Sequence, residues 1–250
     1  MKTNSFSIDL SDRRSYLAIF PTISRLNHSC QPNCNHYWSG RQFKVRAIQK
    51  IAKNDEITIS YMSPLQRSDF HTRESRRKIL QDEFGFWCHC NLCESFTDSD
   101  EKNLEFNDST RSRVLEIEKK WCHLGQEPEK ALSLAEEQLA LGQKLGLQPG
   151  LLAYIALHCV EASSLVFSAT QDQEISSKGR QHAILAKSYG TRAYGENSDE
   201  VEVFSKICEV WTRVDDSDCV GSNKSYNTVG EDLFTIIQES IAKLRDIDKK

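Results

Sequence analysis

Residues 88–93 are Cys-His-Cys-Asn-Leu-Cys, and this stretch decides how the first part of the chain folds. It places three thiols within six residues, so one short loop can turn around a single ion. A zinc ion prefers tetrahedral ligands, with sulfur at about 2.3 Å. Coincidental burial of three thiols at this density would be unusual, and we therefore predict a metal site with Cys88, Cys90 and Cys93 as ligands.

The fourth ligand of this site must come from elsewhere or from the histidine inside the motif. His89 is squeezed between two ligating neighbours, whereas Cys30 and Cys34 both lie in the upstream segment 25–34. Closing the chain between Cys30 and Cys88 costs about 3 to 4 kcal/mol of loop entropy. Structural zinc binding, at roughly 10 to 16 kcal/mol, offsets that cost. The residues alone leave these candidates open.

The composition is that of a folded protein. The chain has 250 residues, of which 38% are hydrophobic and 27% charged, which excludes collagenous and low-complexity chains. Nine cysteines are too sparse for a disulfide scaffold and favour metal binding in a reducing compartment. The first 25 residues contain no long apolar run, and the apolar window 151–167 is shorter than a bilayer span. We therefore expect a soluble protein of the nucleus or cytoplasm, with no membrane partner.

The charge divides the chain into two parts. Residues 1–96 carry a net charge of +5 and residues 97–250 a net charge of −9. The first part has short alternating apolar segments and turn residues, which favour a small irregular β region. The predicted strands lie in residues 16–20, 35–38, 41–48 and 56–61, with turns at Ser39-Gly40 and, hairpin-like, at Lys53-Asn54-Asp55.

The second part is predicted to be helical. A basic helix over residues 68–82 precedes the cysteine motif, and residues 98–101 form an acidic linker. Helices of 12 to 20 residues joined by short breaks indicate antiparallel pairs, either in a tetratricopeptide-like array or in an ordinary bundle. The predicted helices cover residues 113–123, 131–144 (opened by Pro128), 151–167, 181–194, 198–213 and 233–244, with a loose polar stretch at 217–228.

Three motifs in order resemble the SET-domain protein-lysine methyltransferases. They are Asn27-His28-Ser29-Cys30-x-Pro32-Asn33, the segment Asp55–Tyr61, and the Cys-x-Cys-x2-Cys motif, which resembles the post-SET zinc segment. Their order and spacing are similar to the subgroup that combines SET with a MYND finger and a helical tail, here without a MYND finger. The resemblance covers residues 3–94, with a looser similarity in the helical part.

The resemblance implies an α+β fold in four parts. Residues 1–62 form the C-terminal half of an irregular β SET domain, and residues 63–98 a post-SET helix and zinc loop. An all-α, tetratricopeptide-like domain follows over 99–215, then a polar linker and an amphipathic helix over 216–250. The family builds half of its cofactor pocket from an upstream strand pair with a Gly-x-Gly turn, whereas this sequence has no glycine before Gly40. We therefore expect an N-terminally incomplete SET domain.

The resemblance also implies the site residues. Cys30, rather than Cys34, is implied as the fourth zinc ligand. Tyr61 ends its strand with a hydroxyl near the transferring methyl group, and is implied as catalytic and as a cofactor contact. Asn27, His28 and Phe86 are the other residues implied to bind S-adenosylmethionine, and Phe84 is implied to line the lysine channel. Phe84 stands where many relatives have Tyr, so we hypothesise that it permits higher methylation states.

Two functions follow as hypotheses. The first is lysine methyl transfer in the complete protein, with a histone or another protein as substrate and protein partners bound by the helical tail. The second is a catalytically inactive, zinc-stabilised interaction module. Nucleic-acid binding through the basic residues Arg73, Arg76, Arg77 and Lys78 is a weaker reading, because basic helix faces are usually solvated and the rest of the chain is acidic.

Overall fold

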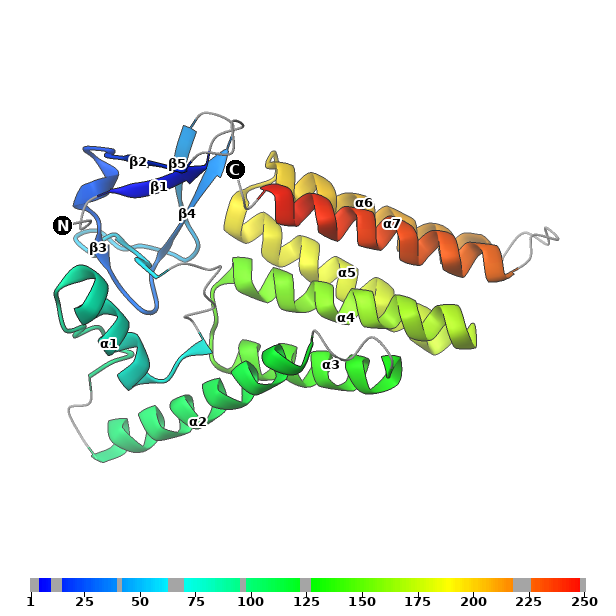
Figure 1. Ribbon diagram of the computed structural model, residues 1–250, viewed down its shortest axis with the longest axis horizontal. Coiled ribbons are helices and arrows are strands. Elements are labelled where there is room, and N and C mark those ends of the chain that lie inside the picture. Colours follow the sequence, from blue (N-terminus) through cyan, green and yellow to red (C-terminus); the bar gives the residue numbers. More distant parts are fainter. Residues whose placement is uncertain are drawn as a thin grey trace. The chain divides into compact units, whose positions relative to one another are not determined.

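The computed structural model describes residues 5–9, 15–39, 42–62, 70–94, 98–121, 127–217 and 226–247. Within these ranges six short strands and one 3-10 helix precede seven α-helices (Figure 1). The strands thus come first and the helices after them, which confirms the predicted α+β class. The predicted turn at Ser39-Gly40 and the polar stretch at 217–228 fall largely outside the described residues, as does the start of the basic helix at residues 68 and 69.

Two antiparallel strand pairs form most of the β region. β1 (Phe6–Asp9) pairs with β2 (Ser15–Ala18), and β4 (Cys34–Ser39) pairs with β5 (Gln42–Ala47). The second pair is the predicted hairpin, with partners from Cys34 opposite Ala47 to Ser39 opposite Gln42. The two pairs meet through aromatic rings, since Phe6 of β1 and Phe43 of β5 lie at a ring-centroid distance of 4.7 Å.

The third pair joins two segments that are distant in sequence. β3 (Asn27–His28) pairs with β6 (Thr58–Ile59), and the pairing is parallel. The predicted turn at Lys53-Asn54-Asp55 is present, since Asn54 adopts the left-handed conformation with φ of 73° and the Asp55 N–H donates to the Ala52 carbonyl at 3.2 Å. The strand after this turn pairs with β3, however, so the turn does not close a hairpin. Asn33 supports the pairing, since its side chain accepts the Thr58 N–H at 2.9 Å and donates to the Glu56 carbonyl at 2.8 Å.

Helix α1 (Arg73–Phe84) has both of its ends defined by side-chain chemistry. The Thr72 hydroxyl caps the N-terminus by accepting the Ser75 N–H. Gly85 ends the helix with φ of 79°, a left-handed conformation that glycine adopts without steric cost. This end brings the cysteine motif back toward the helix.

Helix α2 (Asp98–Trp121) differs from the expectation. The acidic residues 98–101 were predicted as a linker, and the helix was predicted to begin at residue 113. Acidic side chains are favourable at a helix N-terminus because they face the positive end of its dipole. Glu101 is also held by Arg73 of α1, at 2.7 Å, so the acidic run belongs to the helix.

Five further helices complete the described chain, each close to a predicted position but longer. One of them, α4 (Pro149–Thr170), is apolar over enough residues to cross a membrane by length and composition alone, yet 67% of its most apolar window is buried inside the structure, as in the core helix of a folded protein. The helices are α3 (Pro128–Lys144), α4 (Pro149–Thr170), α5 (Gln173–Tyr194), α6 (Asp199–Ser217) and α7 (Tyr226–Ile247).

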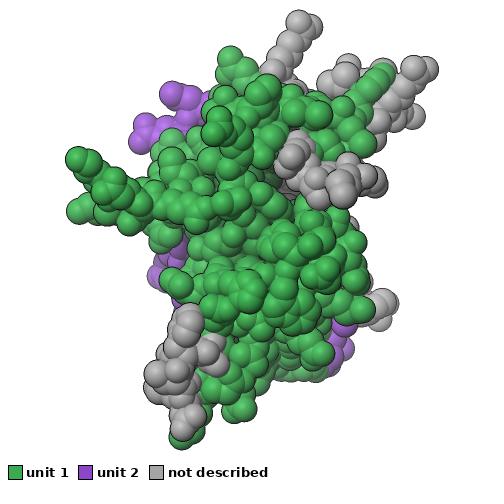
Figure 2. Space-filling view, turned by 90° about the vertical axis from the view of Figure 1, so that its left-hand side faces the viewer, with its two compact units in different colours: residues 1–116, 144–148, 249–250 green, residues 117–143, 149–248 purple. Residues whose placement is uncertain are grey.

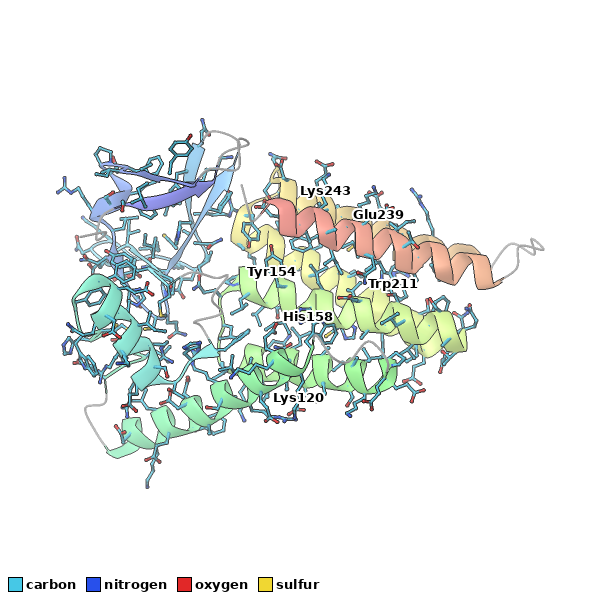
Figure 3. All side chains as sticks on the ribbon, in the orientation of Figure 1. Lys120, Tyr154, His158, Trp211, Glu239 and Lys243 are labelled. Carbon is cyan, nitrogen blue, oxygen red and sulfur yellow. The ribbon has the colours of Figure 1, made fainter. Side chains whose placement is uncertain are left out.

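Two glycines allow α5 and α6 to approach closely. A Cβ atom at Gly179 would lie 2.3 Å from the Trp211 ring, and one at Gly190 would lie 2.3 Å from Phe204. Trp211, labelled in Figure 3, is fully buried. The packing of α5 against α6 therefore requires glycine at positions 179 and 190, opposite the two aromatic rings.

The chain divides into two compact units. Unit 1 comprises residues 1–116, 144–148 and 249–250, and unit 2 comprises residues 117–143 and 149–248 (Figure 2). All the predicted site residues belong to unit 1.

Candidate functional site

Four thiols gather in unit 1, and we call Cys30, Cys88, Cys90 and Cys93 the four-cysteine cluster. Their sulfur atoms all lie within 4.8 Å of one another. Cys30 Sγ is 3.9 Å from Cys88 Sγ and 3.5 Å from Cys93 Sγ. A tetrahedron with metal–sulfur bonds of about 2.3 Å has edges of about 3.8 Å. The cluster could therefore hold a metal ion.

The cluster combines two segments of unit 1 that are distant in sequence, and the local backbone positions the thiols of each. The cysteine loop closes with a tight turn, in which the Cys93 and Glu94 N–H groups donate to the Cys90 carbonyl at 2.7 and 3.1 Å. Cys30 follows β3 by two residues, and the Ser29 N–H continues the ladder to the Ile59 carbonyl at 3.0 Å. The pairing of β3 with β6 thus determines where the fourth thiol lies.

The other candidates for the fourth position lie elsewhere. Cys34 is buried in β4 and is not among the clustered thiols. His89 is exposed and pairs with the Glu94 carboxylate. Among the described residues, the structure therefore places only Cys30 at the fourth corner.

The thiols lie in one small apolar core, and their pKa values are shifted in different directions. Met62, Leu80 and Leu92 pack with the buried cysteines. Hydrogen bonding from Cys30 and Cys88 lowers the pKa of the Cys93 thiol to about 7, while hydrogen bonding with Cys88 raises the pKa of the Cys30 thiol. A thiol that is readily deprotonated is a ready metal ligand, because the thiolate is the ligating form.

Arg76 lies beside the cluster and was not anticipated as part of it. The basic residues of α1 were interpreted as a solvated face, yet Arg76 is only 1% exposed. Its guanidinium donates to the His71 carbonyl at 2.6 Å and the Leu92 carbonyl at 3.3 Å, and it lies 3.8 Å from Cys93 Sγ. The i,i+4 spacing to Leu80, also fully buried, is the sequence signal that could have revealed it.

Tyr61 is held at both ends. Its backbone N–H donates to His28 Nδ1 at 3.0 Å, and its hydroxyl donates to the Leu26 carbonyl at 2.6 Å. Burial, with a smaller contribution from Glu56, raises the pKa of the phenol. The hydroxyl therefore stays protonated at neutral pH, and its oxygen keeps lone pairs free to accept.

Aromatic rings surround Tyr61. Phe84 lies 5.2 Å and Phe86 6.1 Å from it, measured between ring centroids. Both phenylalanines pack against the core that contains the cluster. Trp87 differs from its neighbours, since it is 44% exposed and stacks with Arg77 at 5.3 Å. The structure thus brings the predicted channel residue Phe84 next to the predicted catalytic tyrosine.

Asn27 and His28 have different surroundings although they are adjacent. The Asn27 side chain is exposed and donates to the Glu56 carboxylate at 2.6 Å. The His28 ring is half-buried, with Nε2 3.3 Å from Cys30 Sγ, and burial lowers the pKa of this ring to about 4. The ring contacts of His28 with Tyr61 and Cys30 were not anticipated from the sequence.

The comparisons with known proteins agree on one family. Residues 2–62 match the SET domain. The chain is 36% identical over 118 residues to histone-lysine N-methyltransferase SMYD3 of Homo sapiens, covering 47% of this chain and 26% of that protein. It is 36% identical over 104 residues to N-lysine methyltransferase SMYD2 of Rattus norvegicus, covering 41% and 22%. It is 36% identical over 100 residues to histone-lysine N-methyltransferase set5 of Schizosaccharomyces pombe, covering 36% and 30%. The chain spans about a quarter of the length of these relatives.

Proposed function

We propose that this chain, whose SET sequence at residues 2–62 makes it a member of the SET-domain protein-lysine methyltransferase family, acts in methyl transfer to lysine side chains of proteins. The observation that carries the proposal is Tyr61, held by its N–H and its O–H and lined by Phe84 and Phe86. S-adenosylmethionine supplies the methyl group as a sulfonium substituent. The residues of this chain would bind the cofactor, orient the lysine amine and remove water from it.

The lysine amine must lose its proton before it attacks. With an ordinary pKa of about 10.4, deprotonation at neutral pH costs roughly 4 kcal/mol. Aromatic walls such as Phe84 lower this cost by removing water from the ammonium. The Tyr61 oxygen, with its own proton donated to Leu26, can accept a hydrogen bond from the amine or from a polarised methyl C–H. Its raised pKa makes it a positioning acceptor and not a general base.

Three residues are proposed to contact the adenosine part of the cofactor. Asn27 and His28 are adjacent on β3, and Phe86 lies 6.0 Å from the His28 ring. Both His28 ring nitrogens already have partners within the chain. We therefore assign the His28 contribution to its backbone and ring face, and the hydrogen-bonding contribution to Asn27.

We propose that the four-cysteine cluster binds Zn²⁺ in a structural role. Four thiolates complete the tetrahedral shell, and such closed sites stabilise folds because they have no open position for substrate. In this proposal residues 63–98 are a post-SET segment that follows the SET half over residues 1–62. Residues 99–215 form a tetratricopeptide-like helical domain, and residues 216–250 a linker and final helix.

The substrate is proposed to be a basic protein segment. Residues 97–250 carry a net charge of −9, which attracts a lysine-rich chain over distance. The matched relatives include histone-lysine methyltransferases, which supports a histone or another protein as substrate. The same relatives support action in the nucleus or cytoplasm, and the helical domain is proposed to bind protein partners.

Calorimetric titration with S-adenosylmethionine tests the proposal. We expect binding when these residues are preceded by the Gly-x-Gly strand pair of a relative, and weaker binding by about tenfold when that longer chain carries Asn27→Ala, since one hydrogen bond to a polar ligand contributes about 1 to 1.5 kcal/mol. Tyr61→Phe should keep binding and lose methyl transfer to a histone substrate. Absence of cofactor binding both in this chain and in the same residues preceded by the Gly-x-Gly strand pair of a relative would contradict the proposal.

One observation favours the second candidate function, an interaction module. Leu17, within β2, is 62% exposed, and Ile19, just after β2, is 69% exposed. Exposed apolar side chains next to a strand edge are features of surfaces that bind other proteins. A folded, zinc-loaded chain that binds no cofactor even when the Gly-x-Gly strand pair of a relative precedes it would favour this function.

A further inference from the structure

We propose that His28 couples the four-cysteine cluster to Tyr61 and acts as a positioning residue between them. The proposal rests on the metal site and the Tyr61 role given above. In this proposal the His28 ring links metal loading of the cluster to the geometry of the segment that follows β6 and contains Tyr61.

The two hydrogen bonds of the ring determine its tautomer. The Tyr61 backbone N–H can only donate, so His28 Nδ1, at 3.0 Å, must carry a lone pair. The proton of the neutral imidazole is then on Nε2, which lies 3.3 Å from Cys30 Sγ. His28 therefore accepts from Tyr61 at one edge of the ring and donates to Cys30 sulfur at the other.

The fold leaves this ring little freedom. His28 lies opposite Ile59 in the parallel β3–β6 pair, two residues before Cys30, and Tyr61 follows β6 by two residues. Its ring centroid lies 5.4 Å from that of Tyr61 and 6.0 Å from that of Phe86. A rotation of the ring would break both hydrogen bonds together, so each bond holds the ring in place for the other.

Metal loading strengthens the chain of bonds. Coordination keeps the Cys30 sulfur deprotonated, and a thiolate accepts a hydrogen bond more strongly than a thiol. An imidazole whose Nε2–H is bound to an anion has a more electron-rich Nδ1, which holds the Tyr61 N–H more tightly. We therefore expect the Tyr61 amide to be better protected when the cluster holds zinc.

Two substitutions separate the two bonds. In His28→Asn, the side-chain oxygen takes the place of Nδ1 and keeps the acceptor for Tyr61, but no group reaches Cys30. In His28→Gln, the amide nitrogen takes the place of Nε2 and keeps the donor to Cys30, but the acceptor for Tyr61 is lost. The two variants both carry an amide side chain and differ only in which of the two hydrogen bonds they retain.

The test uses Zn²⁺ as the probe, with amide hydrogen exchange followed by NMR and zinc release to a chromogenic chelator. In the wild-type chain, zinc loading should slow exchange of the Tyr61 amide by about tenfold. His28→Asn should release zinc about ten times faster, because hydrogen-bond partners of metal ligands contribute about that much, and its Tyr61 amide should no longer respond to zinc. His28→Gln should retain zinc and exchange its Tyr61 amide rapidly.

The Thr58 amide provides an internal control, because it donates to Asn33 Oδ1 at 2.9 Å and has no bond to His28. If chelation speeds the exchange of Thr58 and Tyr61 equally in the wild-type chain, general loosening explains the effect and the coupling is overturned, whether or not the variants fold. Failure of the wild-type chain to bind zinc would overturn the metal site and, with it, the coupling. Zinc binding with an unresponsive Tyr61 amide would overturn the coupling alone and leave the proposed function standing.

Discussion

Each of the two units is stabilised internally by a different kind of interaction. In unit 1, pairings as short as the two residues of β3 and β6 are supported by side chains such as Asn33 and His28 and by a cluster of thiols. In unit 2, helices of 17 to 22 residues bury an apolar core around Trp211 and Phe204. The comparison teaches that short strand pairings, as in unit 1, depend on specific bonds for their stability, whereas a unit built of long helices depends on close packing.

Removing a metal ligand should produce the largest difference in stability between the two units. Cys30→Ser should lower zinc binding and unfold unit 1 while the helical signal of unit 2 persists, because structural zinc supplies roughly 10 kcal/mol of folding free energy. Zinc stoichiometry and circular dichroism measure the two effects. Cys34→Ser is the matched control, and equal losses from both variants would contradict the assignment of the fourth ligand.

Arg76→Met should destabilise unit 1 by about 3 kcal/mol or more, because the buried thiolates lose their nearest cation and two carbonyls lose their donor. Urea denaturation of zinc-loaded protein measures the change. Lys78→Met on the same helix removes an exposed pair with Asp82 and should cost less than about 0.5 kcal/mol. Comparable losses of stability in the two variants would contradict the proposed stabilisation of the cluster by Arg76.

Gly179→Ala should destabilise unit 2 by about 1 to 3 kcal/mol and leave zinc retention in unit 1 unchanged. The added methyl group would lie 2.3 Å from the buried Trp211 ring, and overpacking of this kind forces the helices apart. Thermal unfolding at 222 nm checks the cost. Ser177→Ala, at an exposed position of α5, serves as control, and an unchanged melting temperature in Gly179→Ala would show that the core adapts.

The smallest expected effect is a pH dependence of unit 1. Burial lowers the pKa of His36 to about 4, and its ring stacks on Phe43 at 5.5 Å. Between about pH 6.5 and 4 the unfolded chain therefore binds more protons than the folded one, so stability falls as the pH drops through that range. After allowance for partial exposure we expect a loss of about 1 kcal/mol. His36→Leu should reduce the dependence measured by urea midpoints at pH 7 and 4.5, and the remainder is expected from His28, whose pKa is also lowered to about 4. An undiminished dependence would contradict the contribution of His36.

The predictable parts of the fold were those that local patterns encode. The alternation in residues 42–47 predicted the β4–β5 hairpin, and apolar periodicity predicted helices near α3 to α7. The extent of α2 was missed because an acidic run is compatible with a linker and with a helix N-terminus. Its pairing with Arg73, far away in the sequence, shows which of the two applies here.

The sequence by itself determined the chemistry available to this protein. It showed a dense thiol motif, a tyrosine after an apolar strand, aromatic neighbours, and a basic part followed by an acidic one. Such features are local, and residue types carry them directly.

Only the tertiary structure decided how these groups are connected. The parallel pairing of β3 with β6 puts Cys30 against the cysteine loop and His28 between a sulfur and the Tyr61 backbone. Burial turned Arg76 from a surface cation into a neighbour of the thiols. Parallel pairing and burial depend on contacts between residues that are distant in sequence, and no short-range pattern specifies which distant residues will meet.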